Sequence, residues 1–126
     1  MKPFLQGNEV VIVSKVPAAS IKLGDLILVK QEDGTALLHR LIGRRRDAAG
    51  RLMFQTRGDA LLANDAPTPE NRILGKILLI EKRSHESVSR IIDLESRRRQ
   101  AINLCLAAVS LLRPAWCALR RVMETL

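Results

Sequence analysis

The sequence predicts a mainly β domain followed by a C-terminal α-helical tail. Its first 80 or so residues contain five short aliphatic runs, separated by turn signals at intervals of about 10–17 residues. The segment from Ser84 to Leu126 lacks a strand signal and has apolar residues at helical spacing instead. We therefore expect a β domain over residues 1–82 and a helical tail over residues 83–126.

The expected strands follow one another in a regular order. They cover residues 9–13, 26–29, 36–42, 52–56 and 73–80. Asp33-Gly34 is a tight-turn signal between the second and third of these strands. Polar segments at residues 43–50 and 64–69 are expected to be loops. Such short, evenly spaced strands favour a small sheet or barrel.

The tail shows helical periodicity near its start and a break signal near its end. Val88, Ile91 and Ile92 recur at helical spacing. Pro114 is expected to break or kink the helix, because proline lacks the backbone N–H and clashes with the preceding turn. Ser84 to Ser89 is the expected junction between the two parts of the chain.

The apolar stretch of the tail, residues 101–112, is too short to span a bilayer, which takes about 20 residues. Extended to Leu119 it has the length, but it then contains Arg113 and Pro114. We interpret it as a membrane-surface or partner helix, with a true membrane span as the alternative.

Composition and charge narrow the class of partner. Hydrophobic residues make up 47% of the chain and aromatic residues only 2%, so the core is aliphatic and a base-stacking surface is not expected. The net charge is +8, and the arginines cluster at residues 44–46, 97–99 and 120–121. Arg97, Arg98 and Arg99 precede an apolar helix, which favours an anionic membrane surface over nucleic acid. The alternative is that these clusters are solvated faces or that the helix simply caps the β domain.

The cysteines give no sign of a disulfide or a metal site. Cys105 and Cys117 lie about 18 Å apart if the tail is helical, which excludes a bond between them. No Cys or His spacing suggests metal ligands, and we expect no metal and no cofactor. No signal peptide is evident, so the expected location is membrane-associated or cytoplasmic.

Three polar residues stand out against the expected strands. His39 lies inside an apolar strand, Asp59 follows a strand end, and Asp65 lies six residues further on in a loop. A histidine and an acid on neighbouring strands are the base and the orienting acid of a serine hydrolase triad. Taken alone, however, a histidine in a strand is more often structural.

Five short motifs in order strengthen this interpretation. Met1-Lys2-Pro3-Phe4-Leu5 followed by Gly7-Asn8 resembles the first conserved box of type I signal peptidases, Ser-Met-x-Pro and then Gly-Asp. The later motifs resemble the remaining boxes of the same peptidases: Gly24-Asp25-Leu26-Ile27, His39-Arg40-Leu41, Thr56-Arg57-Gly58-Asp59 and Ile73-Leu74-Gly75-Lys76-Ile77. No box is specific by itself, but the ordered set covers residues 1 to about 80.

The chain thus resembles the signal peptidase/LexA-like superfamily. His39 stands where bacterial signal peptidases and LexA-type repressors have lysine, which favours the Ser–His branch of the endoplasmic-reticulum and archaeal enzymes. The resemblance implies a mostly β catalytic fold and cleavage of a leader or precursor peptide. It makes His39 the general base and Asp65 the orienting acid, with Asp59 as the alternate acid. Met1, Pro3 and Leu5 would line the substrate groove.

The sequence also departs from the pattern. The family's nucleophilic serine would stand directly before Met1, so the 126 residues alone are expected to be inactive. Asn8 replaces the usual Asp, and the family's N-terminal membrane anchor is missing. Either an upstream coding segment supplies the serine, which we favour, or the chain is a pseudopeptidase. A basic adaptor that binds peptide, a membrane surface or nucleic acid is the remaining alternative.

Overall fold

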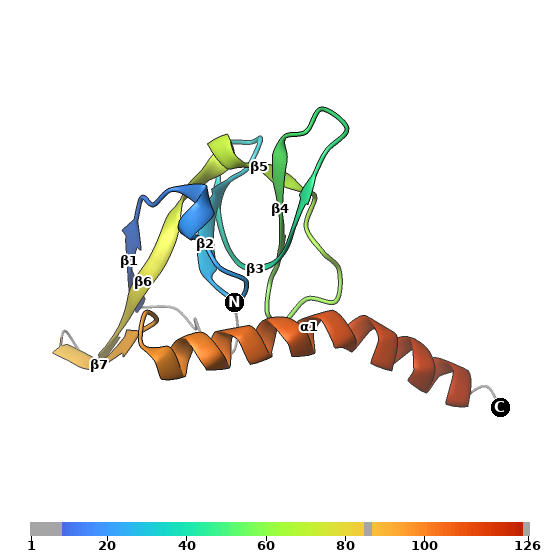
Figure 1. The fold of residues 1–126 in the computed structure, drawn as a ribbon. Helices are drawn as coiled ribbons and strands as arrows, with labels where there is room; N and C mark the ends of the chain where they lie inside the picture. Colours follow the sequence, from blue (N-terminus) through green and yellow to red (C-terminus); the bar gives the residue numbers. More distant parts are fainter. Residues whose placement is uncertain (1–8, 85–86, 125–126) are drawn as a thin grey trace.

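A computed structural model describes residues 9–84 and 87–124 of the chain and shows a curved antiparallel sheet with one long helix (Figure 1). The strands are β1 (Glu9–Ser14), β2 (Leu26–Lys30), β3 (Ala36–Arg46), β4 (Leu52–Arg57), β5 (Thr68–Pro69), β6 (Ile73–Ser84) and β7 (Ser87–Asp93). Two 3-10 turns, η1 (Ala18–Ser20) and η2 (Glu70–Arg72), join strands, and the helix is α1 (Arg97–Glu124). The mainly β class with a C-terminal helix is confirmed.

The sheet is organised around its longest strand, β6. The strand order is β1-β6-β2-β3-β4-β5, and every pairing is antiparallel. The first half of β6 pairs with β2, and its second half pairs with β7. On its other edge β6 pairs with β1. This arrangement places β3, which carries the candidate base, between β2 and β4.

The aliphatic core is divided between the two faces of the sheet. On β2, Ile27 and Val29 contribute to one cluster and Leu26 to the other, as the alternation of side chains along a strand requires. Phe54 is fully buried in the first cluster. No residue of α1 belongs to either cluster among the described residues. The helix is therefore held to the sheet by other contacts.

The helical interpretation of the segment after Ser84 is wrong for its first part. Residues 87–93 form β7, which pairs with β6 in a register that sets Ile92 opposite Ile80 and Val88 opposite Arg83. The apolar residues there fit a strand as well as a helix, and pairing with the exposed edge of β6 decides between them. The junction expected at Ser84 to Ser89 falls where β6 ends and β7 begins, with residues 85–86 outside the described residues, and the helix begins at Arg97.

A break or a kink was expected at Pro114; the break does not occur, because α1 continues through this residue to Glu124. Pro114 is exposed, and the helix axis changes direction in its C-terminal half (Figure 1). A proline inside a helix removes one backbone hydrogen bond and bends the helix without necessarily ending it. Within the described ranges, α1 included, no helix combines the length and the apolar character that crossing a bilayer requires.

Candidate active site

The side chains of His39 and Asp65 meet on the face of the sheet that carries the first core cluster. Nδ1 of the His39 imidazole lies 2.5 Å from Oδ2 of Asp65. The His39 side chain is 9% exposed and the Asp65 side chain 20% exposed. An ionised carboxylate only accepts hydrogen bonds, so Nδ1–H is the donor and the lone pair of the neutral ring lies on Nε2. The ring is thereby oriented as the base of a hydrolase triad requires.

Strand β4 fixes the position of the acid. The Thr56 hydroxyl donates a hydrogen bond of 2.6 Å to Oδ2 of Asp65, and the Asp65 N–H donates to the Thr56 carbonyl at 2.9 Å. The side-chain amide of Gln55 donates to the Asp65 carbonyl. Asp65 lies in a loop, but these contacts tie it to a strand that pairs with β3. The acid and the base are therefore held by neighbouring strands.

Gly58 lies beside Nε2 of His39. A methyl group at Gly58 would come within 3.0 Å of this nitrogen and within 3.1 Å of the Leu61 side chain. Both distances are shorter than ordinary van der Waals contacts. A side chain at Gly58 would therefore crowd the Nε2 edge of the imidazole, and the glycine avoids this.

The second candidate acid, Asp59, has a different partner. Its carboxylate forms a two-pronged ion pair with Arg40, with distances of 2.7 Å to Nε and 2.8 Å to Nη2. The Arg40 guanidinium is fully buried and also donates to the Gly24 carbonyl and to Oδ1 of Asn103 in α1. Neighbouring residues on β3 point to opposite faces, so the His39 side chain contacts Asp65 on one face and the Arg40 side chain contacts α1 on the other. The structure brings Asp65 to His39 and leaves Asp59 with Arg40.

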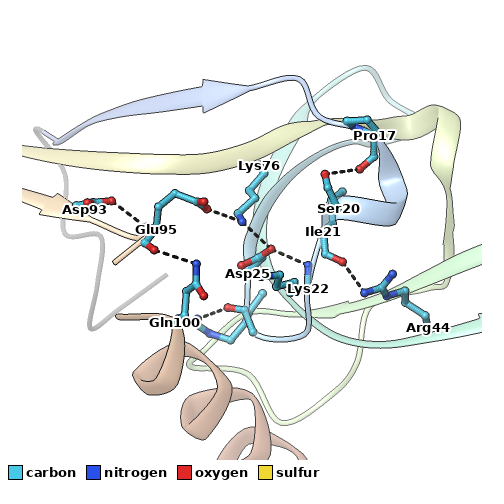
Figure 2. Close-up of polar contacts among 12 residues, drawn as sticks. Pro17, Ser20, Ile21, Lys22, Asp25, Arg44, Lys76, Asp93, Glu95 and Gln100 are labelled. Atoms are coloured by element: carbon cyan, nitrogen blue, oxygen red, sulfur yellow. Dashed lines mark hydrogen bonds and ion pairs between the residues drawn. The ribbon is translucent and has the colours of Figure 1, made fainter. Parts of the chain in front are cut away.

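Two serines, Ser14 and Ser20, precede His39 in the sequence. The register pairs Ser14 with Lys76, Lys76 with Ile27, and Ile27 with His39. Three strand spacings, roughly 14 Å along the sheet, therefore separate Ser14 from the imidazole. The Ser20 hydroxyl donates to the Pro17 carbonyl at 2.7 Å (Figure 2). Ser14 is therefore not placed to react with this base, and the Ser20 hydroxyl is engaged with Pro17.

The groove residues expected from the sequence, Met1, Pro3 and Leu5, lie outside the described residues. A cleft of about 530 Å³ does adjoin the acid, within the size range of ligand pockets. Its wall includes Leu37 and Asp65 and continues over the loop at residues 66–68. Leu37 lies two residues before His39 and thus on the same face of β3. The cleft and the imidazole therefore open from the same face of the sheet.

Lys76 on β6 is a further buried basic group within the sequence motifs. Its ammonium contacts Glu95 at 2.5 Å and Asp25 at 3.1 Å (Figure 2). Burial alone would lower the pKa of Lys76, but the hydrogen bonds to Glu95 and Asp25 outweigh it and raise this pKa above 10.5. Lys76 is consequently protonated at neutral pH and cannot be a general base. Its two ion pairs instead connect β6 with the turn before β2 and with the segment before α1.

Sequence patterns identified His39 and Asp65 but missed the residues that position them. The role of Thr56 follows from its pairing with Leu41 in β3, close to His39, and such a register cannot be read from spacing. Gly58 was part of a recognised motif, and a glycine directly before an aspartate indicates close approach as well as a turn. Over the part of the chain that is described, no three His, Cys, Asp or Glu side chains gather as metal ligands.

Comparison with other proteins adds nothing to this geometry. No family model matches the chain, and no curated protein or solved structure matches it either. The interpretation of His39 and Asp65 therefore depends on the geometry of this chain and on the resemblance of its motifs.

Proposed function

We propose that this protein is a serine endopeptidase of signal-peptidase type that cleaves leader or precursor peptides. The observation that carries the proposal is the contact of 2.5 Å between Nδ1 of His39 and Asp65, with no side chain at Gly58 to crowd Nε2. A buried histidine could be satisfied by any acceptor. An acid held by two strand residues and bonded to Nδ1, so that Nε2 is the nitrogen left to exchange a proton, is the arrangement that general-base catalysis requires.

In the proposed reaction, the nucleophile is a serine directly before Met1, as the motif resemblance implies. Nε2 of His39 takes the proton of the serine hydroxyl while its oxygen attacks the peptide carbonyl. The imidazolium then gives this proton to the departing amine, and an acyl-enzyme forms. Water, deprotonated by the same nitrogen, releases the acyl group and regenerates the serine. Asp65 stabilises the imidazolium in both steps.

The cleft beside Asp65 is the proposed binding place for the peptide. Its wall carries charged residues of both signs, including Lys30, Asp33 and Arg72, and the aliphatic side chain of Leu37. Arg72 is paired with Glu32 at 3.1 Å, so its charge is already balanced. A cleft without a dominant charge suits an uncharged segment of extended peptide. This fits leader peptides cut after small residues, the substrate class that the motif resemblance implies.

The test compares the 126-residue chain with the same chain carrying one serine before Met1. We expect the serine form alone to cleave a leader-bearing peptide and to react covalently with a fluorophosphonate probe. His39→Ala in the serine form should abolish both reactions. His85→Ala removes the other histidine of the sequence and should leave both unchanged.

Full cleavage by the His39→Ala variant would eliminate the assigned base. Peptide binding without cleavage by the serine form would favour the pseudopeptidase alternative. The nucleotide sequence upstream of the Met1 codon gives an independent check, because an in-frame serine codon directly before it is expected.

A further inference from the structure

Helix α1 buries two polar side chains against the sheet and exposes large apolar side chains to solvent. Asn103 and Ser110 are buried against the sheet, one on each side of the small Ala107. Leu112 and Trp116 are 68% and 70% exposed. A helix of a water-soluble domain normally has the opposite arrangement, with its apolar stripe facing the core.

The contacts that hold α1 explain why its apolar side chains are not needed for the fold. Arg40 of β3 donates to Oδ1 of Asn103 at 3.1 Å. Arg57 of β4 donates to the carbonyl of Ser110 and, at 3.2 Å, to its hydroxyl. These buried guanidinium groups fix the inner side of the helix by hydrogen bonds, and its outer side contributes nothing to either core cluster. The apolar outer side requires another explanation.

The outer side forms a continuous apolar face, which we define as Ala101, Cys105, Ala108, Val109, Leu112, Ala115 and Trp116. The spacings of three and four residues place these side chains on one side of the helix. All of them are exposed, Val109 at 58%. The face is about 24 Å long, since 16 residues rise 1.5 Å each.

Arginines flank this apolar face at both ends. The sequence of α1 contains six arginines and one glutamate. Arg97, Arg98 and Arg99 occupy the first turn, where the positive end of the helix dipole disfavours cations. Among the described residues, no salt bridge involves these three side chains. The cluster costs helix stability, so an anionic partner outside the fold is its simplest explanation.

A basic pocket adjoins the apolar face near the start of α1. It has a volume of about 470 Å³ and is lined by Lys22, Leu23, Asp25, Arg44, Arg97, Gln100, Ala101 and Leu104. Figure 2 shows Arg44, Lys22 and Gln100 around this region, with Asp25 directed toward Lys76. The carboxylate of Asp25 is balanced by Lys76, which leaves the pocket with a surplus of positive charge. Exposed Leu23 and Leu104 form its apolar rim.

We propose that α1 lies in the interface of an anionic phospholipid bilayer, with its apolar face among the acyl chains and a lipid phosphate in the pocket beside Arg97. An apolar face flanked by cations is the pattern of interfacial helices. A second copy of the chain fits poorly, because either orientation of two such helices would bring arginines against arginines. A duplex nucleic acid would leave the apolar face uncovered. The proposal is independent of the proposed peptidase activity.

Trp116 provides the test, because it is the chain's one tryptophan, the chain has no tyrosine, and the residue lies on the apolar face. The 126-residue chain is titrated with vesicles of phosphatidylglycerol and phosphatidylcholine, and separately with pure phosphatidylcholine. We expect a blue shift of the Trp116 emission with the anionic vesicles and quenching when their acyl chains are brominated. Pure phosphatidylcholine and inorganic phosphate should leave the emission unchanged.

Matched variants separate the two parts of the proposal. Leu112→Gln should weaken binding to the anionic vesicles about tenfold, because a buried aliphatic side chain is lost from the acyl region. Leu74→Gln, at an exposed leucine on β6, should not weaken it. Arg97→Gln should weaken binding about fivefold, and Arg46→Gln, at an exposed arginine of β3, should have little effect. Circular dichroism confirms that each variant is folded.

An unchanged Trp116 emission with anionic vesicles would overturn the proposal, as would equal responses to charged and uncharged vesicles. A concentration-dependent dimer with a blue-shifted Trp116 in the absence of lipid would assign the face to a second copy. A blue shift on adding duplex DNA, with none on adding vesicles, would assign it to nucleic acid.

Discussion

At the scale of single residues, the site depends on two neighbours with opposite tasks. His39 binds Asp65 on one face of β3, and Arg40 binds Asp59 on the other. The two acids resemble each other in sequence, since each lies near the end of β4 or in the loop after it. Their partners differ because Asp65 reaches the face of β3 that carries His39, whereas Asp59 reaches the opposite face, which carries Arg40. Distance along the chain alone could not assign them.

Gly58 gives a prediction on activity. Gly58→Ala places a methyl group 3.0 Å from Nε2 of His39, which would crowd and shift the imidazole. We expect the serine-bearing form of this variant to lose roughly 100-fold in kcat/KM, the effect of a misplacement of about 1 Å at a reacting group. Gly43→Ala is the control, because its methyl group would be 3.7 Å from Gln55, an ordinary contact. Equal activities of the two variants would contradict the assigned role of Nε2.

Asp59 gives a prediction on stability. Asp59→Ala removes a two-pronged carboxylate from the buried Arg40 guanidinium, and we expect the free energy of unfolding to fall by about 3–5 kcal/mol. Glu32→Ala breaks an exposed pair with Arg72 and should cost less than about 1 kcal/mol. Urea denaturation measures both. In a double-mutant cycle, adding Arg40→Met to Asp59→Ala should restore part of the loss, and strict additivity would argue against a coupled pair.

At the scale of elements, α1 approaches the β domain closely at the turn before β2. Gly24 has a φ of +92°, and a methyl group there would lie 2.7 Å from the backbone of Asn103. The backbone of the helix thus occupies the space that a side chain would need. Together with the hydrogen bonds from Arg40 and Arg57, this contact fixes the height of the helix above the sheet.

Gly24→Ala tests this contact, with Gly34→Ala as the matched control. Both glycines have a positive φ, so both substitutions carry the strain of that conformation, about 1–2 kcal/mol. Only Gly24→Ala adds a clash, because nothing lies within 4 Å of a methyl group at Gly34. We expect the denaturation midpoint of Gly24→Ala to be clearly lower than that of Gly34→Ala. Equal midpoints would mean that α1 can move aside at little cost.

At the scale of the whole molecule, Lys76 connects β6 with the turn before β2, through Asp25, and with the segment before α1, through Glu95. Its pKa is raised in the folded protein, so its contribution to stability is fully present below the unfolded pKa of about 10.4 and is lost as the pH rises through the folded value. We expect the wild type to lose more stability than Lys76→Met between about pH 9 and about pH 12. Denaturant titrations across this range measure the difference. Parallel curves for the two proteins would remove Lys76 from the alkaline transition.

The sequence predicted the class of fold and the pairing of His39 with Asp65, but not the arrangement of the tail. Short strands and turn signals are local, so the segment at residues 26–29 was predicted almost as β2 is observed. The strand β7 was missed because Ile91 and Ile92 suit either structure until β6 offers an edge. The polar inner side of α1 was hidden for a similar reason. Asn103 and Ser110 become interior residues only because Arg40 and Arg57 are buried beneath them.

The alternation of His39 and Arg40 on β3 has a consequence for insertions and deletions. A shift of this strand by one residue would exchange the two faces, with the guanidinium turned toward Asp65 and the imidazole toward Asn103. The contact of His39 with Asp65 and the ion pair of Arg40 with Asp59 would be lost together. Length changes should therefore be tolerated in the hairpin at residues 31–35. They should be excluded between Ala36 and Arg40, because contacts on both faces of β3 determine which face each of these residues points to.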